Sequence, residues 1–184
     1  MVCLACRRLS RPRLCSACAA QLWTGPDRLI GGQLRTRAAF LHTGPARGLV
    51  HNLKYRGIEP AGLLLAEAMA PLLPRGVALV PLPRVDWRLL RYGIAPALLL
   101  ATHLSRLTGL PVIDLLTAPP VGIDQARRSR NQRRAPMFSL RRPPPPVPLV
   151  LIDDVVTTGG TLTSARGALG EAVTQAVTAT ATLR

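Results

Sequence analysis

The sequence is poor in aromatic side chains and lacks the glycine-rich motifs of the common nucleotide-binding proteins. Phe, Trp and Tyr make up only 3% of its 184 residues. This scarcity disfavours a surface that stacks the bases of single-stranded nucleic acid on aromatic rings, so any such contact should be mainly with the phosphate backbone. Neither G-x-x-x-x-G-K-S/T nor G-x-G-x-x-G occurs. Walker A and dinucleotide-binding sites are therefore disfavoured as well.

Long uninterrupted hydrophobic runs are also missing. One of the longest, residues 61–73, is interrupted by Glu67 and Pro71 before it could span a bilayer. The first residues, M-V-C-L-A-C-R-R, lack the apolar stretch of a secretory signal. We therefore expect a cytoplasmic protein without membrane insertion. A hydrophobic content of 48% excludes a disordered chain, and the length suits one main domain with a small appendage.

Acidic residues are scarce relative to basic ones. Twenty-four Lys and Arg residues face nine Asp and Glu residues, which gives a formal net charge of +15, and Lys54 is the only lysine. An excess of this size indicates an anionic partner. The composition leaves two such partners open, a polyphosphate substrate and nucleic acid.

The cysteines are confined to the N-terminus. They form two C-x2-C pairs separated by eight residues, namely Cys3, Cys6, Cys15 and Cys18. Two such pairs can close a tetrahedral four-thiolate Zn2+ site, which leaves no coordination position open for catalysis, and disulfides are disfavoured in a cytoplasmic chain. We therefore predict a structural zinc module at residues 1–24 and a main domain at residues 25–184.

The main domain alternates short apolar segments with segments of helical spacing. Residues 25–32, which contain Gly31-Gly32, are predicted to be a linker. Strands are predicted at 36–42 (as an edge strand), 77–82, 110–116, 138–140, 148–152 and 175–183, and helices at 46–55, 59–73, 95–107 and 162–169. This alternation predicts an α/β fold with a parallel sheet flanked by helices, which binds its ligands at the carboxyl ends of the strands.

Residues 150–161, V-L-I-D-D-V-V-T-T-G-G-T, carry the most informative pattern. The predicted strand at 148–152 ends at two carboxylates, Asp153 and Asp154. Hydroxyl groups and small residues follow immediately before the next predicted helix, at Thr157, Thr158, Gly159, Gly160 and Thr161. Backbone amides at the positive end of a helix suit a phosphate group. The pattern therefore predicts a phosphate-binding loop beside paired acids.

Two other segments gather arginines after predicted strands. The first carries Arg84, Arg88 and Arg91, at spacings that can place several guanidinium groups around one anion. The second, residues 117–137, is predicted to be a flexible basic loop, and its arginines include Arg127, Arg128 and Arg130. A solvated extension of a helix and a lid that closes on a polyanion are both compatible with such a loop.

Taken together, residues 148–169 resemble the signature of the type I phosphoribosyltransferases, and the whole chain is similar to the ComF family. Proteins of that family combine this fold with an N-terminal four-cysteine zinc module, and several are linked to DNA uptake during competence. The resemblance rests on the C-x2-C pairs, N-L-K-Y-R-G at 52–57, P-L-P-R at 81–84, the arginine-rich loop with Arg128 and Asn131, and residues 150–161.

The resemblance implies a type I phosphoribosyltransferase fold that binds phosphoribosyl pyrophosphate with Mg2+. It implies that Asp153 and Asp154 hold the ribose hydroxyls and that residues 157–161 wrap the 5′-phosphate. In a transfer reaction, Mg2+ and the arginines at 84, 88 and 91 would neutralise the pyrophosphate, and closure of residues 117–137 would exclude water.

The chain departs from the family pattern at three places. It reads Y-G-I-A-P-A at 92–97, where relatives commonly read R-G-F-N-Q-A, and it has Pro120 in place of a glutamine. It also has Thr157 where purine-salvage relatives carry an Asp as general base, and we expect His42, His51 and His103 to be structural or exposed. Two functions remain open: phosphoribosyl transfer to an acceptor, or a non-catalytic protein that senses phosphoribosyl pyrophosphate or binds single-stranded DNA or a DNA-uptake protein.

Overall fold

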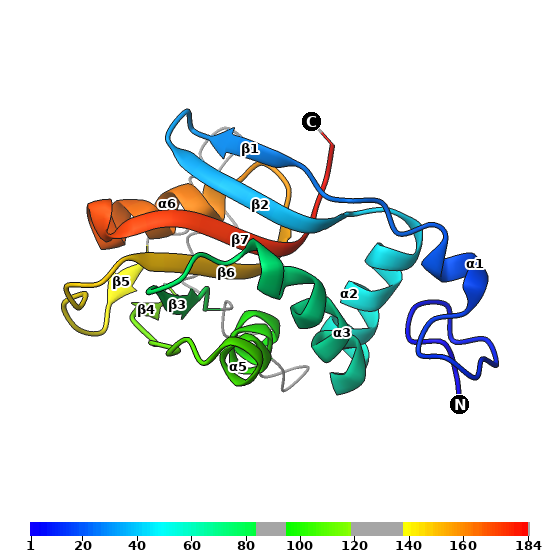
Figure 1. The fold of residues 1–184 in the computed structure, drawn as a ribbon. Coiled ribbons are helices and arrows are strands. Elements are labelled where there is room, and N and C mark those ends of the chain that lie inside the picture. Colours follow the sequence, from blue (N-terminus) through cyan, green and yellow to red (C-terminus); the bar gives the residue numbers. More distant parts are fainter. Residues whose placement is uncertain (84–94, 119–137, 184) are drawn as a thin grey trace, which may run out of the picture.

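The computed structural model describes residues 1–83, 95–118 and 138–183, which form an α/β fold around a five-stranded sheet (Figure 1). The strand order is β1-β2-β7-β6-β3. The strands are β1 (Asp27–Ile30), β2 (Leu34–Leu41), β3 (Ala78–Pro81), β6 (Leu149–Val156) and β7 (Val173–Ala181). Strand β1 pairs antiparallel with β2, and the other neighbours pair in parallel. The predicted α/β class with a mostly parallel sheet is confirmed.

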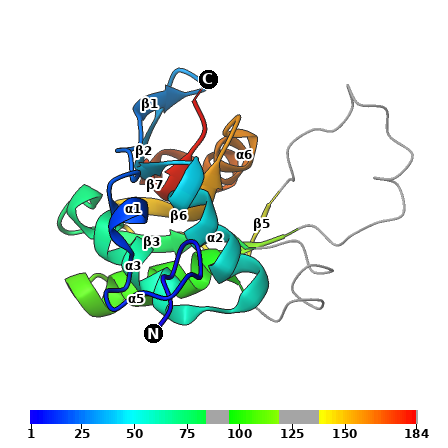
Figure 2. The same ribbon diagram turned by 90° about the vertical axis from the view of Figure 1, so that its right-hand side faces the viewer.

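Helices cover both faces of this sheet. They are α2 (Gly44–Arg56), α3 (Glu59–Met69), α5 (Pro96–Thr108) and α6 (Gly160–Leu169), with short 3-10 turns at Ala70–Leu72 and Gly170–Ala172. The short helix α1 (Ser16–Ala19) belongs to the N-terminal segment and lies beside α2. Figure 2 shows α3 and α5 on one side of β6 and β7 and α6 on the other. No helix in the described part of the chain is long and apolar enough to cross a membrane.

The core is divided by the alternation of side chains along β6. Val150 and Ile152 belong to a buried cluster with residues of α2, α3 and α5, whereas Leu149 and Leu151 belong to a second cluster with residues of α6. Successive side chains of a strand point to opposite faces of a sheet. The continuous apolar run at residues 149–152 of this strand is therefore explained by burial on both faces.

Proline and glycine set the limits of three helices. Pro45, Pro60 and Pro96 lie in the first turns of α2, α3 and α5, where a missing N–H group costs nothing. Gly57 and Gly109 end α2 and α5 in the left-handed conformation, with φ of 64° and 74°. These signals placed the predicted helices within a few residues of the observed ones, although the last turn of the segment predicted at 59–73 is a 3-10 turn.

The predicted linker at 25–32 was wrong, because these residues contribute β1 and the turn of a hairpin. Gly31 and Gly32 have φ of 59° and 72°, and the N–H of Gln33 donates a hydrogen bond of 3.3 Å to the Ile30 carbonyl. Paired glycines with positive φ favour a tight hairpin turn as readily as a linker. Strand β1 pairs with β2 and forms the edge of the sheet, so the predicted edge position of the strand at 36–42 was wrong as well.

The strand predicted at 110–116 is reduced to a fragment. Val112 forms one isolated parallel bridge with Leu79, and only Leu116–Thr117 forms a strand, β4, which pairs antiparallel with β5 (Ser139–Leu140). Pro111 cannot donate a backbone hydrogen bond, so a ladder beside β3 cannot extend through it. The predicted strand at 138–140 is confirmed as β5.

Candidate functional site

The two predicted site acids lie inside β6 and not beyond its end. The strand runs to Val156, so the prediction that it ends at Asp153 was wrong. Asp153 pairs in register with Thr178 of β7. Neighbouring residues of a strand face opposite ways, and here Asp153 lines a cavity with the loop that follows, whereas Asp154 forms an ion pair with α2. The two carboxylates therefore have different surroundings.

The predicted phosphate loop and Asp153 share one small cavity at the carboxyl end of β6. Its volume is about 40 Å3, and it is lined by Asp153, Val155, Val156 and residues 157–162. Gly159 caps the N-terminus of α6 with φ of 82°, and the N–H of Gly160 lies 3.5 Å from Thr158 Oγ1. The first N–H groups of a helix have no partner within the helix and lie at its positive end. This arrangement suits a bound anion.

Strand β1, which was not predicted from the sequence, packs against this loop and donates a hydrogen bond to it. Arg28 donates hydrogen bonds to the backbone carbonyls of Thr157 (2.8 Å) and Thr182 (3.1 Å). A Cβ atom added to Gly159 would lie 2.4 Å from Cγ2 of Ile30. The loop is thus packed closely on β1. No local pattern signals this contact, because residues 27–30 read D-R-L-I, without alternation of polar and apolar side chains.

The environment of Asp153 disfavours its charge. Burial raises the pKa of the Asp153 carboxyl well above its ordinary value, and the negative charge of Asp154 raises it further. The backbone N–H of Asp154, which donates to Asp153 Oδ1 at 2.8 Å, and the charge of Lys54 act in the opposite direction. A carboxylate held in this way gains from a hydroxyl donor or a cation in the cavity.

Asp154 is paired with the only lysine of the chain. Lys54 Nζ lies 2.9 Å from Asp154 Oδ2, and the two side chains are only 19% and 9% exposed. The pair is an electrostatic contact without hydrogen-bond alignment, because Oδ2 has no hydrogen-bond donor in the described structure. The partners are 100 positions apart in the sequence, so only the fold brings them together. Lys54 belongs to the N-L-K-Y-R-G segment noted above.

His42 stands beside the same acid. Its Nδ1 lies 2.8 Å from the hydroxyl of Thr180, which donates to the Asp154 backbone carbonyl at 3.2 Å. Because the hydroxyl has one proton to donate, His42 Nδ1 must supply the other proton, and Nε2 keeps a free lone pair. Burial lowers the pKa of His42, as does the charge of Arg47, while Asp154 opposes them. The lowered pKa of His42 favours its neutral form.

The four cysteines form a second, separate centre. Their sulfur atoms all lie within 4.8 Å of one another, and all four thiols are free of disulfides. Cys6 Sγ and Cys15 Sγ are 3.8 Å apart, and the N–H of Cys15 donates to Cys3 Sγ at 3.4 Å. Although burial opposes it, donation from the backbone of Cys15, Cys6 and Ala5 lowers the pKa of Cys3 to about 6. This grouping fits a metal ion held by four thiolates.

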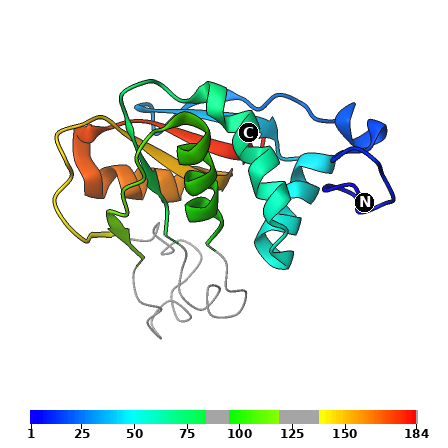
Figure 3. The ribbon, with the colours of Figure 1, turned by 60° about the horizontal axis from the view of Figure 1, so that its bottom comes forward.

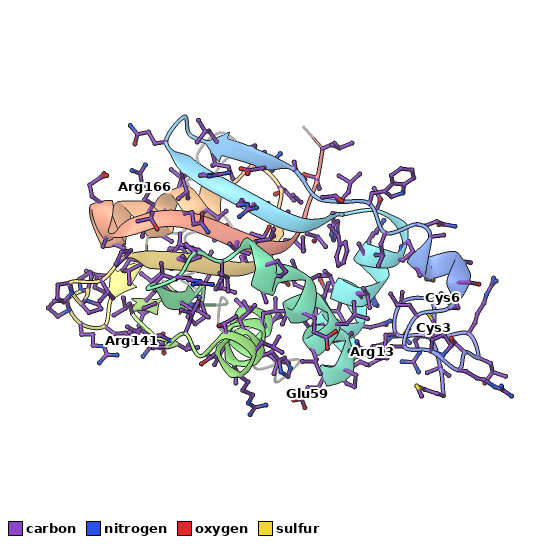
Figure 4. All side chains as sticks on the ribbon, viewed as in Figure 1. Cys3, Cys6, Arg13, Glu59, Arg141 and Arg166 are labelled. Carbon is purple, nitrogen blue, oxygen red and sulfur yellow. The ribbon has the colours of Figure 1, made fainter. Side chains whose placement is uncertain are left out.

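This cysteine centre is attached to the rest of the fold by polar contacts on α2 and α3. Asn52 of α2 donates from Nδ2 to the backbone carbonyls of Leu4 (2.8 Å) and Ala5 (3.1 Å). Arg13 donates two hydrogen bonds to Glu67 of α3, at 2.9 and 2.8 Å. Figure 4 shows Arg13 between the N-terminal segment and α3, and Figure 3 shows that segment against α2, at the end of the molecule away from α6.

The predicted pyrophosphate arginines fall outside the described residues. These are Arg84, Arg88, Arg91, Arg127, Arg128 and Arg130, and most of the predicted lid at 117–137 lies outside as well. Their roles stay predictions. Comparison of the chain with models of known protein families and with curated proteins gives no match.

Proposed function

We propose that the protein binds phosphoribosyl pyrophosphate in the cavity of residues 157–162, as a cytoplasmic phosphoribosyltransferase-like protein of the ComF type. The observation that carries the proposal is the cavity itself. A carboxylate at Asp153 and the T-T-G-G-T loop at the N-terminus of α6 meet there, at the carboxyl end of a parallel strand. Ligands of doubly wound sheets bind at such ends.

The parts of the ligand can be matched to the parts of the site. The loop amides of 157–161 would hold the 5′-phosphate, and Asp153 would accept hydrogen bonds from the ribose hydroxyls. Mg2+, for which the Asp153 carboxylate is a suitable oxygen ligand, would neutralise the charge of the pyrophosphate. Asp154 is paired with Lys54 and would hold the end of β6 in place. The position of its negative charge, next to Asp153, would be fixed by the same pair.

The same cradle supports phosphoribosyl transfer. An acceptor nucleophile would attack the anomeric carbon of the ribose, and the bond to pyrophosphate would break with its electron pair leaving on the pyrophosphate. The transition state carries positive charge on the sugar, so an ionised Asp153 nearby would stabilise it. Release of pyrophosphate, measured against a panel of bases, amines and nucleic acids, distinguishes transfer from binding alone.

Ligand binding is tested by calorimetry and by thermal melting of the full chain. We expect phosphoribosyl pyrophosphate with Mg2+ to raise the melting temperature, and Asp153→Ala to abolish the rise. Asp114→Ala is the matched control, because Asp114 is exposed and pairs with Arg141 away from the cavity. A parent protein whose melting temperature does not change with the ligand would refute the proposal.

We propose Zn2+ as the metal of the cysteine centre. Four thiolates at the Zn–S distance of about 2.3 Å stand about 3.8 Å apart in a tetrahedron. The Cys6–Cys15 separation of 3.8 Å equals that value. With four thiolates the coordination is closed, so the ion would stabilise the fold without taking part in catalysis. Elemental analysis should find about one zinc per chain.

A second function, binding of single-stranded DNA, is favoured by the charge. The chain carries +15, and the exposed Arg7, Arg8 and Arg11 between the cysteine pairs form no ion pair with a carboxylate of the described residues. Such binding should weaken steeply with salt and depend little on base sequence. Fluorescence anisotropy of labelled oligonucleotides at low and high salt measures this, and unchanged anisotropy at low salt would exclude it.

A further inference from the structure

Arg28 connects the candidate phosphate loop to the segment that follows β7. Its guanidinium group donates from one terminal nitrogen to the Thr157 carbonyl at 2.8 Å and from the other to the Thr182 carbonyl at 3.1 Å. Thr157 is the first residue of the loop, and Thr182 follows β7. The planar guanidinium group thus joins the segments that follow β6 and β7.

The hairpin that carries Arg28 is itself fixed against the loop. Ile30, two residues further along β1, is buried and fills the space behind Gly159 so closely that no Cβ would fit there. Asp27 holds the other side of the hairpin through an ion pair with Arg35 of β2 at 2.7 Å. Arg28 therefore approaches the loop from a rigid element.

We infer that Arg28 is a positioning residue for anion binding by the loop, an inference that rests on the proposed function. In a trans peptide the C=O and N–H groups point in opposite directions. By holding the Thr157 carbonyl, Arg28 fixes the direction of the Thr158 N–H in a residue that lines the cavity. Its charge also offsets the partial negative charges of two carbonyl groups near the place of a phosphate.

The details of Arg28 favour this role over simple packing. Its Nε is buried and has no hydrogen-bond partner in the described structure. An unsatisfied buried donor is costly, and an apolar side chain of the same length would avoid that cost. The guanidinium group is needed only if its two carbonyl contacts and its charge serve the loop.

The test uses the full chain, ribose 5-phosphate as the probe and isothermal titration calorimetry. Met matches the aliphatic length of Arg and would satisfy a packing role, whereas Lys keeps the charge and a donor. We expect Arg28→Met to raise the dissociation constant at least about tenfold, as befits the loss of charge-assisted hydrogen bonds. Arg28→Lys, which keeps the charge and a donor but cannot hold both carbonyls, should bind more tightly than Arg28→Met and more weakly than the parent.

The matched control is Arg75→Met, because Arg75 is exposed, carries the same charge and precedes β3, at the amino ends of the parallel strands and away from the loop. Its affinity should stay within about twofold of the parent, since distant sites act independently. Circular dichroism reports folding, and if Arg28→Met does not fold, Arg28→Gln takes its place with the same expectation.

Failure of the inference and failure of the proposed function give different results. If the parent does not bind ribose 5-phosphate, the proposed function is refuted, and the role of Arg28 with it. If the parent binds and Arg28→Met binds equally well, only the role of Arg28 is refuted. An equal loss in Arg28→Met and Arg75→Met would reduce the effect to net charge and would also overturn the inference.

Discussion

At the scale of single residues, Lys54 and Asp154 form the pair whose disruption should cost the most stability. Removing one partner of a buried ion pair leaves an uncompensated charge, whereas replacing both partners removes the problem. We expect Lys54→Met to lower the free energy of unfolding by about 3 kcal/mol, the low end of the usual range because Lys54 keeps some exposure. Lys54→Met combined with Asp154→Leu should recover most of that loss. Urea unfolding of the two single variants and the double variant measures the coupling, and additive effects would contradict it.

The ionisable carboxyl of Asp153 should make the folded chain less stable at neutral pH than a neutral side chain at the same position would. Its pKa is raised by folding, so above the unfolded value of about 3.8 the unfolded state releases a proton that the folded state retains. Stability from this group is therefore lost as pH rises from about 4 through the raised pKa. Asp153→Asn does not titrate and keeps an acceptor for the Asp154 N–H. We expect the variant to be more stable than the parent at pH 8, by a margin that shrinks toward pH 4.

Urea unfolding at several pH values measures this margin. Asp114→Asn is the control, because Asp114 is exposed and paired with Arg141 at 3.3 Å. It should show little change, since an exposed ion pair contributes little. A margin for Asp153→Asn that is constant with pH would show that the folded carboxyl titrates normally.

At the scale of elements, the loop between β6 and α6 depends on Gly159. A side chain there meets both an unfavourable φ of 82° and the side chain of Ile30. We expect Gly159→Ala to lower the free energy of unfolding by about 1 to 3 kcal/mol and to weaken ligand binding, because the loop must move. Gly167→Ala, in the exposed part of the same helix with nothing near its Cβ, should instead stabilise by about 0.5 to 1 kcal/mol. Thermal and urea unfolding compare the two variants, and equal effects would contradict the role given to the loop.

The elements show which parts of the fold the sequence could predict. Helices α2 and α5 have a proline in the first turn and a glycine at the C-cap, which are local signals, and β6 is apolar at residues 149–152. Strand β1 was missed because Gly31-Gly32 suits both a hairpin turn and a linker, and only the pairing with β2 decides between them. The prediction of a full strand at 110–116 failed because periodicity was given more weight than Pro111, which cannot donate to a ladder beside β3.

The candidate site likewise has parts that could be predicted from the sequence and parts that could not. The loop at 157–161 was visible because its residues are adjacent in the sequence. The contacts of Arg28 with Thr157 and of Lys54 with Asp154 join residues about 100 or more positions apart, and no local pattern encodes them. The opposite directions of Asp153 and Asp154 follow from strand geometry once β6 is known to extend through them.

At the scale of the whole molecule, the cysteine centre and the candidate site share α2. Asn52 of this helix binds the first cysteine pair through Leu4 and Ala5, and Lys54, two residues later, binds Asp154. Cys3 and Cys18 are buried in the same hydrophobic cluster as Leu49 and Leu53 of α2. A metal-bound N-terminus should therefore unfold together with the domain in one cooperative transition.

Loss of the metal should consequently destabilise the whole chain. Binding of a metal by four thiolates contributes directly to the free energy of folding. Cys6 is exposed, so Cys6→Ser removes a ligand without opening the core. We expect this variant, and the parent treated with a strong zinc chelator, to melt at least about 5 °C lower in a single transition. Arg8→Ser, in the same exposed loop, should melt like the parent. If calorimetry instead shows the domain melting unchanged after chelation, the cysteine centre is not coupled to the fold that holds the loop, and α2 does not transmit its stability to Lys54.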